Sequence, residues 1–197
     1  MYENTFIYGR DKEGITRSIL TDKNGALLVP SGKHANAAAE GRLFSVANAA
    51  AVATTADDAA TWTGLGVANP TGSNKLLVML EFGWALSVVG PDEGILGLMA
   101  VTDGGFAEAL TIRCARFGAG SSVAFADDGA TIVTPVLERV VSTYGTGAIT
   151  TWQGAGPQIY NINGSIVIPP GRGIVTNTTT ATTAAFQFSF LWEEIDA

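Results

Sequence analysis

The single histidine, His34, is the first residue to consider for catalysis or metal binding. It lies in SGKHANAAAEG, among small residues and without a nucleophile motif nearby, so a Ser-His-Asp triad has no support there. One histidine also excludes the metal sites that need two or three imidazole ligands. We therefore expect His34 to be a solvated or interface residue, and we expect neither a metal nor another cofactor.

Three pairs of neighbouring carboxylates are the other candidates for acid-base chemistry: Asp92–Glu93, Asp127–Asp128 and Glu193–Glu194. A glycosidase needs two carboxylates that face one bond, whereas adjacent residues of a strand point to opposite faces of the sheet. The first two pairs also lie in GPDEG and ADDGA, which are compositions typical of turns. The sequence therefore predicts no catalytic residues, and we expect a protein that is not an enzyme.

Other chemistry-bearing motifs are missing. No GxxxxGK[ST] occurs and no GxGxxG opens a helix after a strand, so nucleotide binding has no support. The single cysteine, Cys114, excludes an intramolecular disulfide, and TIRCARF around it predicts a small buried side chain. Trp84 and Trp192 lie in strand patterns and are expected in the core. Trp62 and Trp152 lie near predicted loops and stay open as sugar-stacking residues.

Composition and charge narrow the fold class and the partners. The chain has 197 residues, of which 24 are glycine and only 15% are charged, and this usage favours an all-β protein. The 47% of hydrophobic residues is enough for a compact core. A formal net charge of -7 repels phosphate backbones and anionic lipids, so we expect neither nucleic acid nor membrane as a partner. MYENTFIYGRDKEG lacks the pattern of a signal peptide, which predicts synthesis in a cytoplasm.

Two regions carry the clearest strand patterns. Alternation in AAFQFSFLWEEI predicts a C-terminal strand with one buried face, formed by Phe186, Phe188, Phe190 and Trp192. NPTGSN predicts a turn, and the dense apolar run KLLVMLEFGWALSVV after it predicts a strand covered on both faces. We expect TWTGLGVANPTGSN as a whole to be a loop.

The remaining apolar runs are short and separated by turn compositions such as DDG, NING and PPGRG, which favours a β-sandwich or barrel. Residues 1–40 differ, because they hold short apolar groups between charges and glycines. TDKNGALLV predicts a small hairpin, and SGKHANAAAEG predicts a connector with one short helical turn. We therefore predict an N-terminal arm over residues 1–40 and one β domain over residues 41–197.

The order of these segments resembles a known family. TDKNGALLV, GRLFSVANAA, NPTGSNKLLVML and IVIPPGRGIVTNTTTATTAAFQFSFLWEEI resemble jelly-roll virion proteins, above all the capsid decoration (cement) proteins of tailed bacteriophages. The resemblance covers most of the chain and depends on the pattern, order and turn placement of the segments. It implies a jelly-roll β-sandwich with an extended N-terminal arm, a homotrimer, and the major capsid protein as partner on the capsid surface of a virion. It brings no catalytic residue.

The arm is the predicted contact region. Residues 1–42 hold six of the 11 basic residues but only five of the 18 acidic ones, so the arm is less acidic than the body. This asymmetry orients docking, and an extended arm can add a strand to an exposed sheet edge. Aromatic anchors beside cations are typical of protein interfaces. The predicted capsid or subunit contacts are Tyr2, Phe6, Ile7, Tyr8, Arg10, Lys12 and Arg17.

Several hypotheses about function therefore remain open. The first is a structural virion protein that binds and stabilises a capsid shell. The second is a carbohydrate- or receptor-binding tail protein with a jelly roll, which would use Trp62 or Trp152 in a loop-rimmed pocket. The third is a β-sandwich glycosidase or lyase that uses carboxylates. The sequence also leaves open whether the chain is itself the shell-forming subunit.

Overall fold

A computed structural model describes the backbone of two short strands near the N-terminus and five longer segments: residues 34–57, 61–86, 93–144, 158–183 and 186–197. The chain divides into two compact units, Met1–Asn36 and Ala37–Ala197. In the first unit, strands β1 (Tyr8–Arg10) and β2 (Thr16–Ser18) pair antiparallel. The hairpin predicted in TDKNGALLV lies outside the described residues.

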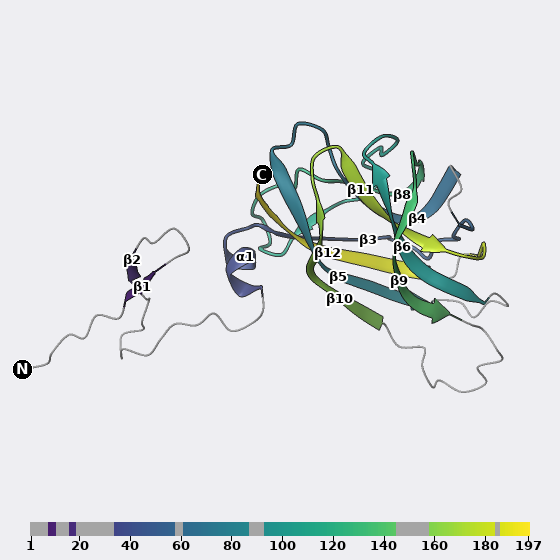
Figure 1. The fold of residues 1–197 in the computed structure, drawn as a ribbon, viewed down its shortest axis with the longest axis horizontal. Coiled ribbons are helices and arrows are strands. Elements are labelled where there is room, and N and C mark those ends of the chain that lie inside the picture. The colour runs from purple at the N-terminus through teal and green to yellow at the C-terminus, as the bar shows by residue number, and fades with distance from the viewer. Residues whose placement is uncertain are drawn as a thin grey trace, which may run out of the picture. The chain divides into compact units, whose positions relative to one another are not determined.

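In the described part of the second unit, ten strands form two antiparallel five-stranded sheets that pack face to face (Figure 1). The first sheet has the order β10-β5-β12-β3-β7. Its strands are β3 (Leu43–Ala47), β5 (Lys75–Leu86), β7 (Arg113–Cys114), β10 (Gln158–Ile168) and β12 (Phe186–Asp196). The second sheet has the order β8-β4-β11-β6-β9. Its strands are β4 (Thr61–Asn69), β6 (Gly94–Thr102), β8 (Phe125–Thr131), β9 (Val136–Tyr144) and β11 (Arg172–Thr178).

The strand order is that of a jelly roll, which confirms the expected fold class. Four antiparallel pairs are nested along the chain: β3 with β12, β4 with β11, β5 with β10, and β6 with β9. The contacts β12–β5 and β11–β6 then join these pairs into two sheets, so that a long two-stranded ribbon is rolled into a sandwich. The segment between β6 and β9, residues 103–135, supplies β7 and β8. We call this segment the insertion; it adds one strand to each sheet, beside β3 and β4.

The aromatic side chains of β12 form the centre of the core. All four alternating positions are at most 2% exposed, as predicted from their spacing: Phe186, Phe188, Phe190 and Trp192. The Phe190 ring lies 5.1 Å from the ring of Phe82 on β5. Leu65 and Leu96 of the opposite sheet belong to the same cluster, so both sheets share one core. Burial of each such side chain contributes about 1.5–3 kcal/mol.

The turn predicted in NPTGSN is confirmed between β4 and β5. Asn69 is buried at the end of β4, and its Nδ2 donates to the carbonyl oxygens of Lys75 at 2.7 Å and Ile168 at 2.9 Å. Asn74 adopts a φ of 55°, which asparagine tolerates better than most residues. The side chain of Asn69 therefore holds the start of β5 and the end of β10 together.

The loop predicted over TWTGLGVAN is wrong, because these residues form β4. The glycines of this strand are required by close packing. A Cβ on Gly64 would lie 2.2 Å from Oγ1 of Thr176, and one on Gly66 would lie 2.7 Å from the Phe106 ring. Glycine in a strand marks such a close approach as well as a turn, and only the neighbours distinguish the two cases.

Two smaller clusters lie on the outer faces of the sheets. Trp62, Met99 and Val175 of the second sheet are covered by the insertion, including its residues Phe106 and Ile132. On the first sheet, Ala37 of the short helix α1 (Ala35–Ala39) packs against Leu43 and Leu80, which confirms the predicted helical turn. The helix covers β5 only near Leu80. The prediction that β5 is covered on both faces is therefore correct only at Leu80, since Leu76, Val78, Glu81 and Gly83 on the outer face are only half-buried.

The apolar run ALTIRCARF forms almost no strand. Only Arg113 and Cys114 pair, with Ser45 and Phe44 of β3. Cys114 is half-buried and packs against the core. β7 is short because the insertion crosses from one sheet to the other at this point. The local amino-acid composition does not predict that crossing.

Candidate interaction surface

The described residues offer no cluster for metal chemistry. No group of three or more His, Cys, Asp or Glu side chains within them could hold a metal ion. His34 is half-buried directly before α1. Asp92 lies outside the described residues, and Glu93 is exposed.

Asp127 and Asp128 lie in β8, so the turn predicted for ADDGA is wrong. Asp127 is 1% exposed. Its Oδ2 accepts a hydrogen bond from the Ala107 amide at 2.9 Å, and its Oδ1 accepts one from the Gly129 amide at 3.2 Å. Both bonds hold backbone of the insertion, because a buried carboxylate needs donors in place of water. This carboxylate is therefore part of the fold and faces no open site.

Glu193 and Glu194 point to opposite faces, as expected for adjacent residues of a strand. Glu193 forms an ion pair with Arg42. Glu194 is 5% exposed, and its carboxylate accepts hydrogen bonds from the Ser122 hydroxyl, the Val123 amide and the Trp192 indole. These donors fasten the insertion to β12.

One side of the sandwich is closed by the insertion. The Leu110 amide donates to the Ala126 oxygen of β8 at 3.0 Å, and the Ala115 amide donates to the Leu43 oxygen of β3 at 2.8 Å. Between these bonds, Ile112 packs against the core. The insertion therefore spans from one sheet to the other and covers the core between them. We call this the closed edge.

The other side, between β9 and β10, differs, and we call it the open edge. A single side-chain bond bridges these two strands in the described structure, from Nη1 of Arg139 to Oγ of Ser165 at 2.8 Å. Ser165 follows an irregular segment of β10 in which Asn163 and Gly164 have φ values of 54° and 77°. Irregular edge strands resist unlimited strand addition, so the open edge is suited to a specific partner.

Exposed apolar side chains collect at the open edge. Of the eight large hydrophobic residues that are exposed in the described structure, six lie on β6, β9 and β10. Their exposed fractions run from 38% to 64%, and they are Ile95, Val136, Leu137, Val140, Ile159 and Val167. Single exposed apolar residues are ordinary, whereas a group on neighbouring strands is typical of interaction sites. Ile159 and Val167 lie on the outer face of the first sheet and Ile95 on the outer face of the second, so the group flanks the open edge on both sides.

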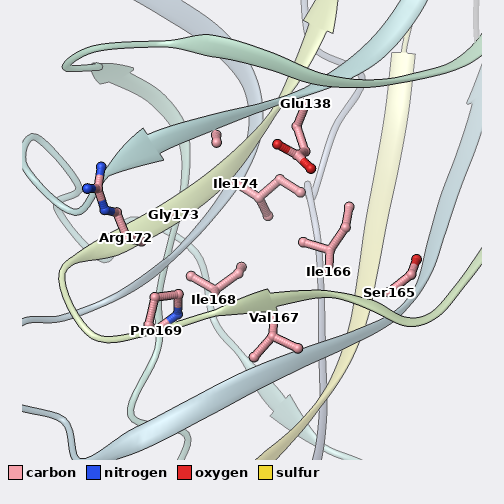
Figure 2. Close-up of a pocket in the computed structure, with 10 residues that line it drawn as sticks. Glu138, Ser165, Ile166, Val167, Ile168, Pro169, Arg172, Gly173 and Ile174 are labelled. Carbon is pink, nitrogen blue, oxygen red and sulfur yellow. The ribbon is translucent and has the colours of Figure 1, made fainter.

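A groove of about 370 Å³ enters the sandwich at the open edge (Figure 2). Its lining includes Ile166 and Ile168 of β10 and Ile174 of β11, which also belong to the core. Two charged residues, Glu138 of β9 and Arg172 of β11, complete the lining, and both are exposed. Figure 2 shows these two charges well apart, with the isoleucine side chains lying below Glu138 in that view. The groove thus combines an apolar floor with two opposite charges.

The contact residues predicted from the sequence lie in the first unit. Tyr8 and Arg10 belong to β1, and Arg17 belongs to β2, where it pairs with Gly9. The other four lie outside the described residues: Tyr2, Phe6, Ile7 and Lys12. The open edge was missed by sequence reasoning. VLERVV in β9 was a signal for it, since two apolar pairs flank two charges there.

Trp62 and Trp192 offer no platform for a sugar, because their rings are buried, whereas the half-buried Trp84 lines a groove of about 340 Å³. Trp62 is 1% exposed, and its indole donates to the Thr176 oxygen at 2.7 Å, so its ring is not accessible for stacking. Trp192 is fully buried, as expected, and Trp84 is half-buried against the core. Trp152 lies outside the described residues.

The described helical residues include no stretch that is both long and apolar enough to cross a membrane. Besides the open edge and its groove, the described residues line a groove of about 480 Å³ between β3 and the insertion and one of about 340 Å³ beside Trp84. No family model, curated protein or solved structure matches this chain.

Proposed function

We propose that this protein is a structural virion protein that decorates and stabilises a bacteriophage capsid. The observation that carries the proposal is the open edge of the jelly roll. The six exposed apolar residues on β6, β9 and β10 lie at this edge, and the opposite edge is closed by the chain's own insertion. A chain that covers one edge and leaves the other apolar is suited to a permanent protein partner.

The chemistry of the described residues supports a structural role. The buried carboxylates Asp127 and Glu194 are occupied by hydrogen bonds that hold the insertion. The groove at the open edge has a carboxylate and a guanidinium on its rim, but no nucleophile paired with a base among its lining residues. Binding of another chain fits this arrangement better than turnover of a substrate.

The partners we propose are the major capsid protein and identical subunits in a homotrimer. Closed symmetric assembly is the usual outcome for soluble oligomers, and it would cover apolar surface that the single chain exposes. The aromatic and basic residues of the arm, among them Tyr8 and Arg10, are proposed to contact the capsid surface. In this proposal the protein is made in the host cytoplasm and ends on the outside of the shell.

Quantitative mass spectrometry of purified phage particles tests the proposal. A copy number near that of the major capsid protein is expected for a decoration protein. A handful of copies would instead indicate a tail or receptor-binding role, and a glycan array would then test sugar binding. Absence of the chain from particles would refute a virion role altogether.

Removal of the arm tests the attachment surface. Deleting residues 1–30 should leave the melting temperature of the sandwich nearly unchanged, because the second unit begins at Ala37. Co-sedimentation with capsids should fall sharply. Unchanged co-sedimentation would place the attachment on the sandwich alone, and a large drop in melting temperature would make the arm part of the fold.

A further inference from the structure

The groove at the open edge carries two charges that the fold does not use. Among the described residues, neither the Glu138 carboxylate nor the Arg172 guanidinium makes a side-chain hydrogen bond or an ion pair. Other charged groups on this body are used: Lys75 pairs with Asp196, and Arg139 donates to Ser165. Opposite charges held apart above an apolar floor are suited to a ligand that supplies both counter-charges.

The walls of the groove define the shape of that ligand. One wall is β10 and another includes Glu138 of β9, so the groove runs beside edge strands. An extended peptide segment fits such a space, with an apolar side chain over Ile166, Ile168 and Ile174. An acidic side chain on one flank would meet Arg172, and a basic one on the other would meet Glu138. Alternate residues of an extended segment share one face and lie about 7 Å apart.

The N-terminal unit of this chain contains such a pattern. The stretch EGITR places Glu13, Ile15 and Arg17 at alternate positions, in the order acid, apolar, base. Arg17 belongs to β2, which pairs only over three residues with β1 in the described structure. Gly9 of β1 is its cross-strand partner.

We propose that residues 13–17 of a second copy of this chain occupy the groove. Ile15 lies on the isoleucine floor, Arg17 pairs with Glu138, and Glu13 pairs with Arg172. The assignment rests on the self-association proposed above, but it does not require the capsid. It separates two tasks of the N-terminal unit: residues 13–17 join copies, while the aromatic residues before them remain available to a capsid.

Charge exchange in the full-length protein tests the pairing of Arg17 with Glu138. Self-association is measured by sedimentation velocity over a range of concentrations. Glu138→Arg and Arg17→Glu should each weaken association about tenfold or more, as expected for loss and reversal of an interfacial charge pair. The double variant should recover most of that loss, because it restores the attraction with the charges exchanged. Glu138→Gln, which keeps the shape of the side chain, should give a smaller loss.

The pairing of Glu13 with Arg172 and a matched control variant make the test specific. Arg172→Glu should be rescued by Glu13→Arg, whereas Glu138→Arg combined with Glu13→Arg should not recover. Glu108→Arg changes the charge of the same protein at an exposed position outside the groove and should leave association unchanged. Circular dichroism melts of every variant report whether folding is preserved.

Three results would overturn the proposal. The first is unchanged association in all single variants, and the second is loss without rescue in the matched pairs. The third is a chain that stays monomeric at every concentration, which would leave no second copy to fill the groove. Capsid co-sedimentation, measured on the same variants, separates this proposal from the proposed function: intact self-association without capsid binding would refute only the latter.

Discussion

The two edges of this jelly roll differ in how the chain bridges the two sheets. At the closed edge, residues of the insertion bond to β8 and β3, and Glu194 fastens Ser122 and Val123 to β12. At the open edge, the described side-chain bridge is the single bond from Arg139 to Ser165. The difference indicates which edge the chain covers with its own residues and which edge leaves apolar side chains exposed.

The core between the edges should give the largest effect on stability. Phe188→Ala and Trp192→Ala should each lower the free energy of unfolding by about 3–5 kcal/mol, because each leaves a cavity among packed aromatic rings. Chemical denaturation of the purified variants measures the loss. Gln187→Ala, on the exposed face of the same strand, is the control and should stay within about 0.5 kcal/mol of wild type. Equal losses at all three positions would remove the basis for treating β12 as the centre.

The second largest loss of stability is expected at the closed edge. Glu194→Ala leaves the Ser122, Val123 and Trp192 donors without their acceptor, and buried unsatisfied groups cost about 1–3 kcal/mol. Urea denaturation should show this loss. Glu193→Ala removes a partly exposed ion pair and should cost at most about 1 kcal/mol. If the two variants were equally stable, the insertion would not depend on the buried carboxylate.

At the open edge, substitutions should weaken association and leave the stability nearly unchanged. Leu137→Ser and Val140→Ser change side chains that are more than half exposed, so stability should change by about 0.5 kcal/mol or less. Association with a partner should weaken, since the apolar contact area is reduced. Light scattering and capsid co-sedimentation provide the two measurements. A strong fall in melting temperature would mean that these side chains are packed within the chain, and the contrast between the edges would fail.

The smallest effect is expected at the C-terminal end of β12. The hydrogen bond from Lys75, aided by its positive charge, holds the pKa of Asp196 below its ordinary value. A carboxylate with a lowered pKa stabilises the folded state above its unfolded pKa of about 3.9, and this contribution is lost as the pH falls through the folded pKa. NMR titration should show the low pKa in wild type. In Lys75→Met the pKa should return toward the ordinary value, and an unchanged titration curve would contradict the assigned cause.

Sequence reasoning was strongest where one residue pattern determines one structure. Alternation along β12 identified its buried face, since a strand with four aromatic residues at every second position has one way to bury them. The turn in NPTGSN was equally clear, because proline, glycine and asparagine each restrict the backbone there.

The wrong predictions concern segments whose structure depends on residues far away in the sequence. The loop was predicted over β4 because Asn-Pro and Gly-Ser lie at or just after its end, whereas Gly64 and Gly66 within the strand are explained by the side chains of Thr176 and Phe106. The short β7 and the strand position of Asp127 depend on how the insertion crosses between the sheets. The groove was not predictable either. Glu138, Ile166 and Arg172 meet only because β9, β10 and β11 come together in the fold.

The nesting of the strand pairs also affects how the chain reaches its native state. The outermost pair, β3 with β12, joins Leu43 to Glu193, so the first sheet is complete only after nearly the whole chain has left the ribosome. The innermost pair, β6 with β9, can form earlier, but it already carries four of the six exposed apolar residues, Ile95, Val136, Leu137 and Val140. Sheets made of such distant pairings fold slowly and leave unpaired edges accessible meanwhile. A nascent chain therefore exposes the apolar residues of β6 and β9 before its own core is closed.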